Sequence, residues 1–397
     1  MRPHLLRPTG PLILLLAHAL LVTSPLGCGQ RASPASPTRF DPTPFTDARP
    51  NLPGSVQVTY SGEAVGPLTL HGAPQGEGSP YFVDGWQVTF DTYLISLGNL
   101  RLTRDPEASQ DPSVLGPVVA QAPGPFLVDM AAASDFSQAS GSGALLRWTH
   151  QDDGTPFARD GRYGFSFASR PATADMQVMG AVEPQQLAAR AQMAAAGWTH
   201  YIAGTATFVG SGVHPDAAMQ KRFAALPAQV PFVFGFNAAG NILNCRNPDL
   251  AGAHGLQATA AGAVNLQITA HVEHLFWDAL GAESAPLRFD PIAAQASSLP
   301  GAPPLALHTL QQSLRATFSD GTPLPDRAPY ITGLTVPTEQ RGQVVYNTGS
   351  LPATAISNLA DLMAFSVQAQ LHLNGGGLCF IRGQHPGDPY LTPRLGG

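Results

Sequence analysis

Hydrophobic and polar residues alternate in short stretches from about residue 55 onwards. The alternation is clear at 56–60, 86–90 and 266–273, and a period of two residues is typical of strands that bury one face. Clusters of turn-forming residues separate these stretches at intervals of roughly ten residues, as in β-sandwiches. The pattern therefore predicts a mainly β fold, an antiparallel β-sandwich.

One short-range signal predicts a hairpin within this pattern. The dipeptide Asp84-Gly85 stands between the apolar residues 81–83 and the alternating stretch 86–91. Both residue types tolerate a positive φ, which tight hairpin turns require. We therefore expect a hairpin over residues 81–91.

Two segments depart from the period of two residues. Residues 183–196 are rich in alanine and glutamine and are followed by Gly197, which predicts a short helix that ends at the glycine. Residues 355–373 carry apolar residues at a spacing close to 3.6 and predict a C-terminal helix. Residues 281–350 are rich in turn formers, with weak helical character at 305–316. The predicted fold is a β-sandwich with a few helical insertions and a C-terminal helix.

The N-terminal residues 1–27 predict a secretion signal. Arginines precede an apolar run at 11–22, which has the length of a signal-peptide core and is too short to span a bilayer. Cys28 follows in a context that resembles the lipobox of bacterial lipoproteins, where the cysteine is lipidated and becomes the mature N-terminus. Pro25 stands where that pattern usually has leucine, so cleavage elsewhere by an ordinary signal peptidase is the alternative.

The next segment predicts a tether. Residues 28–53 contain six prolines and few apolar residues, so they bury too little apolar area to form a packed element. We expect residues 54–397 to form the β-sandwich domain, with a subdivision near residue 210 as an open alternative.

Composition narrows the function classes. Charged residues make up 12% of the 397 residues, against roughly 25% in ordinary soluble domains. The net charge is −6, and Lys221 is the one lysine among 21 basic residues. The chain offers no cationic stripe for a phosphate backbone, so nucleic acid is not an expected partner. Phosphate-loop and Gly-x-Ser-x-Gly motifs do not occur, and no catalytic triad is indicated.

The remaining cysteines predict a disulfide. With Cys28 assigned to the anchor, Cys245 and Cys379 are left, and two cysteines in an oxidising envelope most simply pair with each other. Two buried thiols are the alternative.

One constellation predicts a metal site. His271 and His274 follow the alternating stretch that ends near residue 273, and Asp278 comes four residues later. If a helical turn begins there, His274 and Asp278 share a face and His271 can reach them. Imidazoles with a carboxylate suit copper or zinc rather than calcium or magnesium. In the alternative, the first histidine is exposed at a strand end and the second caps or packs in the core.

The other histidines are weaker candidates. The alternation around His200 predicts a buried core histidine. His254, His372 and His385 lie near glycine-rich bends or the C-terminus, and only the fold could bring one of them to residues 271–278.

The order of several motifs resembles a family of uncharacterised bacterial envelope lipoproteins of myxobacterial type. The motifs are Asp84-Gly85-Trp86 with VTFDTYLISLGNLRL, Phe126–Asp129, Ala203–Thr207, Phe232–Phe236 leading to Cys245, HVEHLFWDAL with Arg288-Phe289-Asp290, and Asn358-Leu359 leading to Cys379. The stretch VTFDTYLISLGNLRL is also distantly similar to the sandwich of the copper-binding MbnP-like proteins. Relatives follow the arginine-phenylalanine-aspartate motif with an acidic, calcium-loop-like stretch, whereas residues 292–300 here carry no carboxylate, which argues against calcium.

These observations lead to one functional hypothesis and two alternatives. The leading hypothesis is a non-enzymatic envelope lipoprotein that faces the periplasm or cell surface, is held to a membrane through Cys28, and binds a copper- or zinc-class ion through His271, His274 and Asp278. The first alternative is a structural or protein-interaction module of the envelope without metal. The second is a hydrolase with an unrecognised site.

Overall fold

The computed structural model describes residues 52–62, 68–75, 79–132, 143–180, 184–280, 285–299, 301, 303–334, 342–349 and 356–382. The predicted signal segment, Cys28 and nearly all of the predicted tether lie outside these residues. Within the described part of the chain, no helix has the length and apolar character needed to cross a bilayer.

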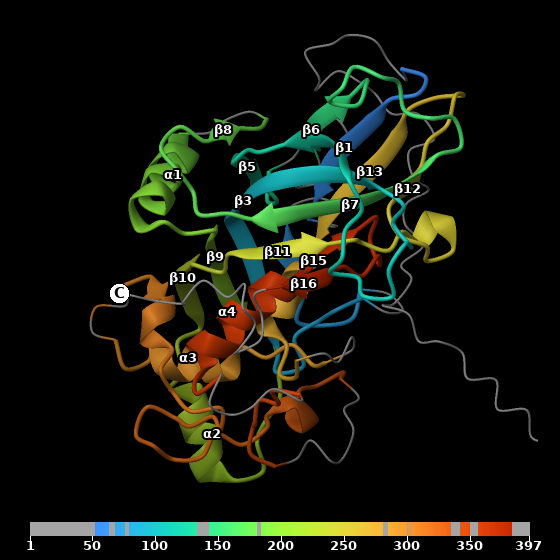
Figure 1. Ribbon diagram of the computed structural model, residues 1–397. Helices are drawn as coiled ribbons and strands as arrows, with labels where there is room; N and C mark the ends of the chain where they lie inside the picture. The colour runs from blue at the N-terminus through green and yellow to red at the C-terminus, as the bar shows by residue number, and fades with distance from the viewer. Residues whose placement is uncertain are drawn as a thin grey trace, which may run out of the picture.

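Strands, α-helices and short 3-10 helices (η) alternate along the described chain (Figure 1). In chain order they are β1 (Val56–Ser61), β2 (Thr69–Leu70), β3 (Trp86–Arg104), β4 (Val118–Ala122), β5 (Phe126–Asp129), β6 (Gly143–Trp148), β7 (Arg162–Ser169), β8 (Gln177–Val178), α1 (Pro184–Ala196), β9 (His200–Phe208), α2 (Ala217–Ala224), β10 (Gln229–Phe236), β11 (Gly240–Leu243), η1 (Pro248–Leu250), β12 (Leu256–Gln257), β13 (Val264–Ala270), η2 (Val272–Phe276), α3 (Asp290–Ala296), β14 (Leu305–Ala306), η3 (Leu307–Thr309), η4 (Ala328–Tyr330), α4 (Leu359–Ala369), β15 (Leu371–Leu373) and β16 (Phe380–Arg382).

The strands form two sheets. The smaller has the order β15-β13-β1-β6, in which β1 and β13 are parallel and the other pairs are antiparallel. The larger follows the path β14-β10-β9-β3-β7-β11-β16, with β2, β4, β5, β8 and β12 attached beside it. Its pairs are antiparallel apart from β10 with β14 and β5 with β8. The predicted mainly β, two-sheet architecture with helical insertions is confirmed.

Strand β3 is the central strand of the larger sheet. It pairs with β9 along its first half and with β7 along its second half, so its 19 residues cross most of the molecule. The predicted hairpin over 81–91 is wrong. Gly85 has the expected positive φ of 83°, but Tyr81 and Phe82 pair with His71 and Leu287 instead of with β3. Strands β2 and β9 pair with the beginning of β3, so they occupy the edges along which residues 81–83 would have paired in a hairpin.

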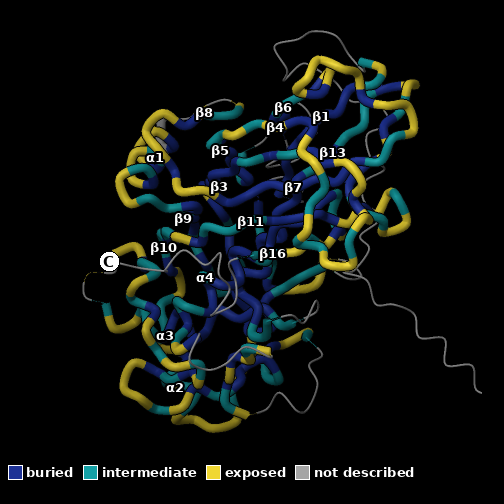
Figure 2. The backbone as a smooth tube through the Cα atoms, in the orientation of Figure 1, coloured by how far each residue is buried: buried dark blue, intermediate teal, exposed yellow. Residues whose placement is uncertain are grey.

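A single large apolar cluster joins the two sheets. Val58 and Ile268 from the smaller sheet and Phe167 and Phe232 from the larger belong to it, and all four side chains are at most 1% exposed. Figure 2 shows the buried backbone running through the centre of the molecule, with exposed segments around it. Described residues before and after residue 210 contribute to this same cluster.

Helix α1 confirms the predicted helical insertion. Its Ala189 and Met193 pack with Leu94 and Leu127 in a second, smaller apolar cluster. The chain leaves the helix at Gly197 with a φ of 65°, a conformation that glycine adopts without steric cost. The helix therefore covers a part of the larger sheet that the main core does not.

The predicted C-terminal helix is shorter than expected. Asn358 caps α4 by accepting a hydrogen bond from the Asp361 backbone N–H, but the helix ends at Ala369, and Leu371–Leu373 pair with β13 instead. Backbone hydrogen bonds to an open strand edge outweigh a weak helical preference over these residues. The segment predicted as the end of a helix is therefore strand β15.

The turn-rich region 281–350 contains a helix that the sequence pattern missed. Helix α3 begins with Asp290 and Pro291 in its first turn, where both residue types are favourable. The weak helical character at 305–316 corresponds to β14 and η3. The sequence pattern did not reveal α3, because a helix of seven residues is too short to show a helical period.

Buried ion pairs hold this region together and join it to the segment that follows η2. The guanidinium of Arg288 donates to Asp278 at 2.5 Å and to both oxygens of Asp326 at 2.7 and 3.1 Å. The Arg288 side chain is 4% exposed. A desolvated guanidinium needs such partners, because an unpaired buried charge is strongly unfavourable.

A second group of buried polar residues joins α3 to β3. The carboxylate of Asp290 accepts from Trp86 Nε1 at 2.7 Å and from Arg327 Nε at 2.9 Å. One oxygen of Asp84 accepts from the backbone N–H groups of Phe289 and Asp290 at 2.7 and 2.8 Å. The other oxygen, Oδ1, is buried without a partner among the described residues.

Burial, followed by the nearby Asp290, raises the pKa of Asp84 to about 7. Between pH 4 and 7 the folded chain therefore holds a proton that the unfolded chain has lost, so the free energy of unfolding falls as the pH rises through this range. We expect Asp84→Asn to flatten this dependence and to be more stable than the wild type at pH 8, by on the order of 1–4 kcal/mol.

Urea denaturation at pH 5, 6, 7 and 8 measures this effect, with the exposed Asp91→Asn as the control for loss of one carboxylate. If Asp84→Asn keeps the wild-type pH dependence, Asp84 is not the group with the raised pKa.

Candidate metal site

Two histidines and a glutamate meet where the smaller sheet ends. Strand β13 stops at Ala270, and the His271 backbone N–H donates to the Gln370 carbonyl at 2.8 Å. Helix η2 then begins, and the His274 N–H donates to the His271 carbonyl at 3.1 Å. Donor atoms of His271, Glu273 and His274 lie within 4.8 Å of one another.

The 3-10 geometry explains why the two histidines face each other. His271 is the residue before η2, and the hydrogen bond from the His274 N–H to its carbonyl closes the first 3-10 turn, which brings residues three positions apart to the same side. Their rings are stacked with centroids 5.2 Å apart and planes at 22°. The spacing of histidines in this segment therefore suits the short helix that forms there.

A third histidine arrives from a distant part of the chain. His372 lies on β15, in register with Thr269 of β13. Its ring centroid is 4.4 Å from that of His271 and 5.5 Å from that of His274. His372 is outside the closest group of donor atoms, but it borders the site. Sequence reasoning had no signal for it beyond its residue type.

Asp278, a predicted ligand, does not belong to this group of donor atoms. Helix η2 ends at Phe276, Trp277 is extended with a ψ of 139°, and it pairs with Leu287. The helical face expected to carry His274 and Asp278 is therefore absent, and the Asp278 carboxylate is ion-paired with Arg288 at 2.5 Å. Glu273, which the sequence reasoning passed over, supplies the carboxylate beside the histidines.

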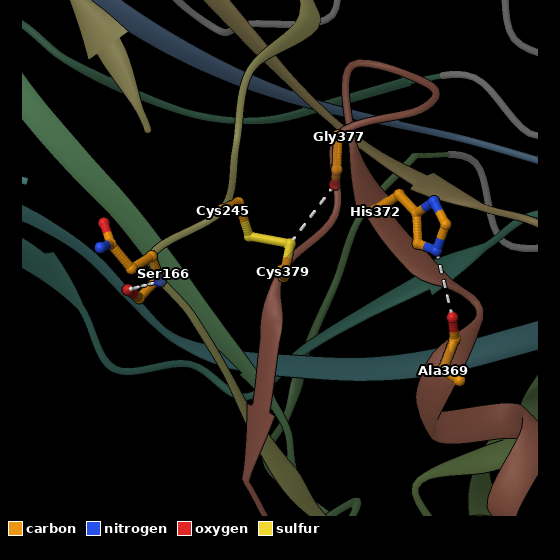
Figure 3. Close-up of a disulfide and its surroundings, with 7 residues drawn as sticks. Ser166, Cys245, Ala369, His372, Gly377 and Cys379 are labelled. Atoms are coloured by element: carbon orange, nitrogen blue, oxygen red, sulfur yellow. Dashed lines mark hydrogen bonds between the residues drawn. A yellow bond between two sulfur atoms is a disulfide. The ribbon is translucent and has the colours of Figure 1, made fainter. Parts of the chain in front are cut away.

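The predicted disulfide is present and lies next to the site (Figure 3). Cys245 and Cys379 are joined at 2.03 Å. Leu373 and Gly377 exchange two backbone hydrogen bonds of 2.9 Å, which close the turn between β15 and Cys379. The bridge therefore fastens the strand and turn that carry His372.

The same turn provides a hydrogen-bond partner for His271. Its Nε2 faces the Gly375 carbonyl at 3.0 Å, and its Nδ1 faces Glu273 Oε1 at 3.2 Å. Asn374 holds the turn against β13, because its side-chain oxygen accepts from the Gln267 N–H at 2.7 Å. Turn, strand and η2 are thus joined around the histidine rings.

Protonation states follow from burial. His274 stacks on Trp277 with centroids 3.6 Å apart. Burial lowers the pKa of His274 to about 4 and that of His372 to about 3, so both rings are neutral at pH 7. Burial alone raises the pKa of Glu273, but the hydrogen bond from His271 and the nearby imidazoles bring it to about 2. The site therefore combines two neutral imidazoles, those of His274 and His372, with an ionised carboxylate.

Two ring nitrogens in this site are buried without a partner among the described residues. His372 Nε2 faces the Ala369 carbonyl at 3.2 Å and so carries the proton, which leaves Nδ1 as an acceptor. The Nδ1 atoms of His274 and His372 are buried and have no hydrogen-bond partner among the described residues. A ring N–H donated to a backbone carbonyl is the usual support of a metal-ligating histidine.

The remaining histidines lie elsewhere. His200 is fully buried, as its alternation predicted, with Nδ1 at 2.8 Å from the Thr199 hydroxyl. The Nδ1 atom of His254 lies 3.8 Å from Oε1 of Glu107. His385 lies outside the described residues.

The disulfide closes a loop over a sequence separation of 134 residues. The chain-entropy relation gives about 5 kcal/mol as the upper limit for such a loop, and measured values are typically about 2–4 kcal/mol. We expect Cys245→Ala with Cys379→Ala to lower the free energy of unfolding by this typical amount. Urea denaturation with and without a reductant measures this effect. The reduced wild type should have the same unfolding midpoint as the double variant, and the reductant should not change the midpoint of the double variant. An unchanged midpoint in the double variant would contradict a stabilising role.

Comparison with protein-family models, with curated proteins and with solved structures finds no match to this chain.

Proposed function

We propose that this chain is a non-enzymatic envelope lipoprotein that binds a transition-metal ion of the copper or zinc class through His271, Glu273 and His274, with His372 beside them. The observation that carries the proposal is the pair of buried Nδ1 atoms, on His274 and His372, that lack partners next to an ionised carboxylate. A buried polar atom without a partner costs about 1–3 kcal/mol. A cation bound among His271, Glu273 and His274 would give the His274 ring a ligand, and His372 lies beside that ion.

The donor set matches the chemistry of these metals. Imidazole nitrogen and carboxylate oxygen are the ligands that zinc and copper use, whereas calcium and magnesium prefer oxygen alone. Two donors on one zinc at about 2.0 Å lie about 3.3 Å apart in a tetrahedron. His271 Nδ1 and Glu273 Oε1 are 3.2 Å apart in their hydrogen bond, so an ion that replaced the shared proton would need little change in this spacing.

Burial supports binding rather than catalysis. His271 is 9% exposed and His274 is 4% exposed, so a substrate has little access to the ligands. A catalytic zinc site keeps an open coordination position for water or substrate. A closed site suits storage, transfer or structural use of the ion.

Placement in the envelope rests on two further features. The Cys245–Cys379 bridge is of the kind that persists in oxidising compartments. Cys28 after an apolar run supplies the proposed lipid anchor, and the proline-rich residues up to 53 supply the tether. The proposed partner is a membrane, to which the chain attaches through that anchor. Nucleic acid is not proposed as a partner.

The test is titration of the metal-free protein with Zn²⁺ and Cu²⁺, by calorimetry against a competing chelator and by elemental analysis after dialysis. We expect one ion per chain in the wild type. Glu273→Gln and His274→Gln remove one donor each at nearly constant volume, and affinity should fall at least about tenfold in each variant.

Asp278→Asn is the matched control, because it removes the carboxylate that sequence spacing suggested but that is paired with Arg288. It should keep the wild-type affinity for the metal. Wild-type metal content in the His274→Gln variant, or no binding by the wild type, would contradict the proposal and favour a structural or interaction module in which the histidines only pack.

A further inference from the structure

A cavity of about 280 Å³ lies between the beginning of β3, the end of β9, α2 and η4. Figure 1 shows α2 at the end of the molecule farthest from α1. None of the histidines of the candidate metal site lines this cavity. Its walls come from Trp86, Phe208, Gly212, His214, Gln220, Phe223, Ala224, Leu226, Pro227, Ala228, Arg327, Tyr330 and Ile331.

Aromatic rings and one guanidinium dominate the walls. The guanidinium carbon of Arg327 lies 4.1 Å from the ring centroid of Phe208 and 4.8 Å from that of Phe223. The Tyr330 ring packs edge-on against His214 with centroids 4.6 Å apart. These contacts hold flat apolar surfaces in place around the space.

Arg327 has a hydrogen-bonding edge to spare. Its Nε and Nη2 donate to the two oxygens of Asp290, which fixes the plane of the guanidinium. Its Nη1 makes no hydrogen bond with any described residue, although the side chain is only 10% exposed. The cavity therefore contains a rigid, nearly buried cation with free N–H groups.

Two neutral groups add donors and no acceptors. His214 Nδ1 accepts from the Asp216 N–H at 3.1 Å, so the proton of the neutral ring is on Nε2. Gln220 Oε1 accepts from the His214 backbone N–H at 2.7 Å, which leaves the side-chain N–H₂ group to donate. The acceptors of both side chains are used within the protein, whereas their donors are not.

We propose that this cavity binds a small organic carboxylate with a flat apolar body, of the arylacetate class. The carboxylate would accept from Arg327 Nη1 and from the neighbouring donors, and the body would lie against Phe208, Phe223 and Tyr330. A convergent set of donors in an apolar cavity is the usual form of a small-molecule site. Because Asp290 already offsets the charge of Arg327, the apolar body contributes much of the affinity.

Calorimetry or ligand-observed NMR with phenylacetate and its neutral analogue phenylacetamide tests this proposal. A ligand of this size is expected to bind with a dissociation constant on the order of 0.1–1 mM. The amide should bind at least about tenfold more weakly, because an ionised acceptor forms the stronger hydrogen bonds with a guanidinium.

Variants at the mouth of the cavity separate this site from weak surface binding. Ala224 is exposed and lines the cavity, whereas its exposed neighbour Ala225 does not. Ala224→Trp should abolish binding of phenylacetate, and Ala225→Trp should retain it. Gln220→Leu should weaken binding about three- to tenfold by removing one donor.

Arg327 itself is a poor first variant, since its loss leaves Asp290 buried and unpaired. The proposal is overturned if phenylacetate shows no saturable binding up to about 10 mM, if Ala224→Trp binds it as the wild type does, or if the amide binds equally well.

Discussion

The pairing of β13 with its two neighbours is the constraint on which this arrangement depends. Strand β1, near the beginning of the described chain, lies on one side of β13, and β15, near its end, lies on the other. Because each backbone N–H and C=O in a buried sheet needs a partner, the register is fixed by a ladder of hydrogen bonds. A slip of one residue would turn His372 to the opposite face of the sheet and separate it from His271.

Two buried polar groups show how differently such residues can be used. Around Arg288 and Arg327, the guanidinium donors are largely matched by carboxylate oxygens from Asp278, Asp290 and Asp326. This arrangement holds the turn-rich region together, and the hydrogen bond from Trp86 to Asp290 joins it to β3. Around His271 the balance differs, since the Nδ1 atoms of His274 and His372 have no hydrogen-bond partner in the described part of the chain. Unused coordinating capacity at the same place as an ionised Glu273 favours a ligand, whereas matched ion pairs favour a structural role.

The sequence predicted local features well and their partners less well. Helix α1 and the two-sheet architecture follow from composition and periodicity, and the Cys245–Cys379 bridge follows from the cysteine count and the compartment that was expected. The hairpin at Asp84-Gly85 failed, although its turn is present, because the strand after Gly85 pairs with β9. One of the three predicted metal ligands, Asp278, lies outside the group of donor atoms for a similar reason. Residues 272–276 adopt a 3-10 rather than an α-helical turn, which selects Glu273 and leaves Asp278 to Arg288.

The amino-acid sequence by itself determined where many of the strands form, where helix α1 ends, and that two histidines lie close together near residue 271, because each of these depends on neighbours within a few positions. Only the tertiary structure decided that β15 would be a strand, that His372 would join His271, and that Arg327 would border an aromatic cavity. Those outcomes depend on hydrogen bonds and packing between segments far apart in the chain, and no local pattern of residues specifies which distant partner will be met.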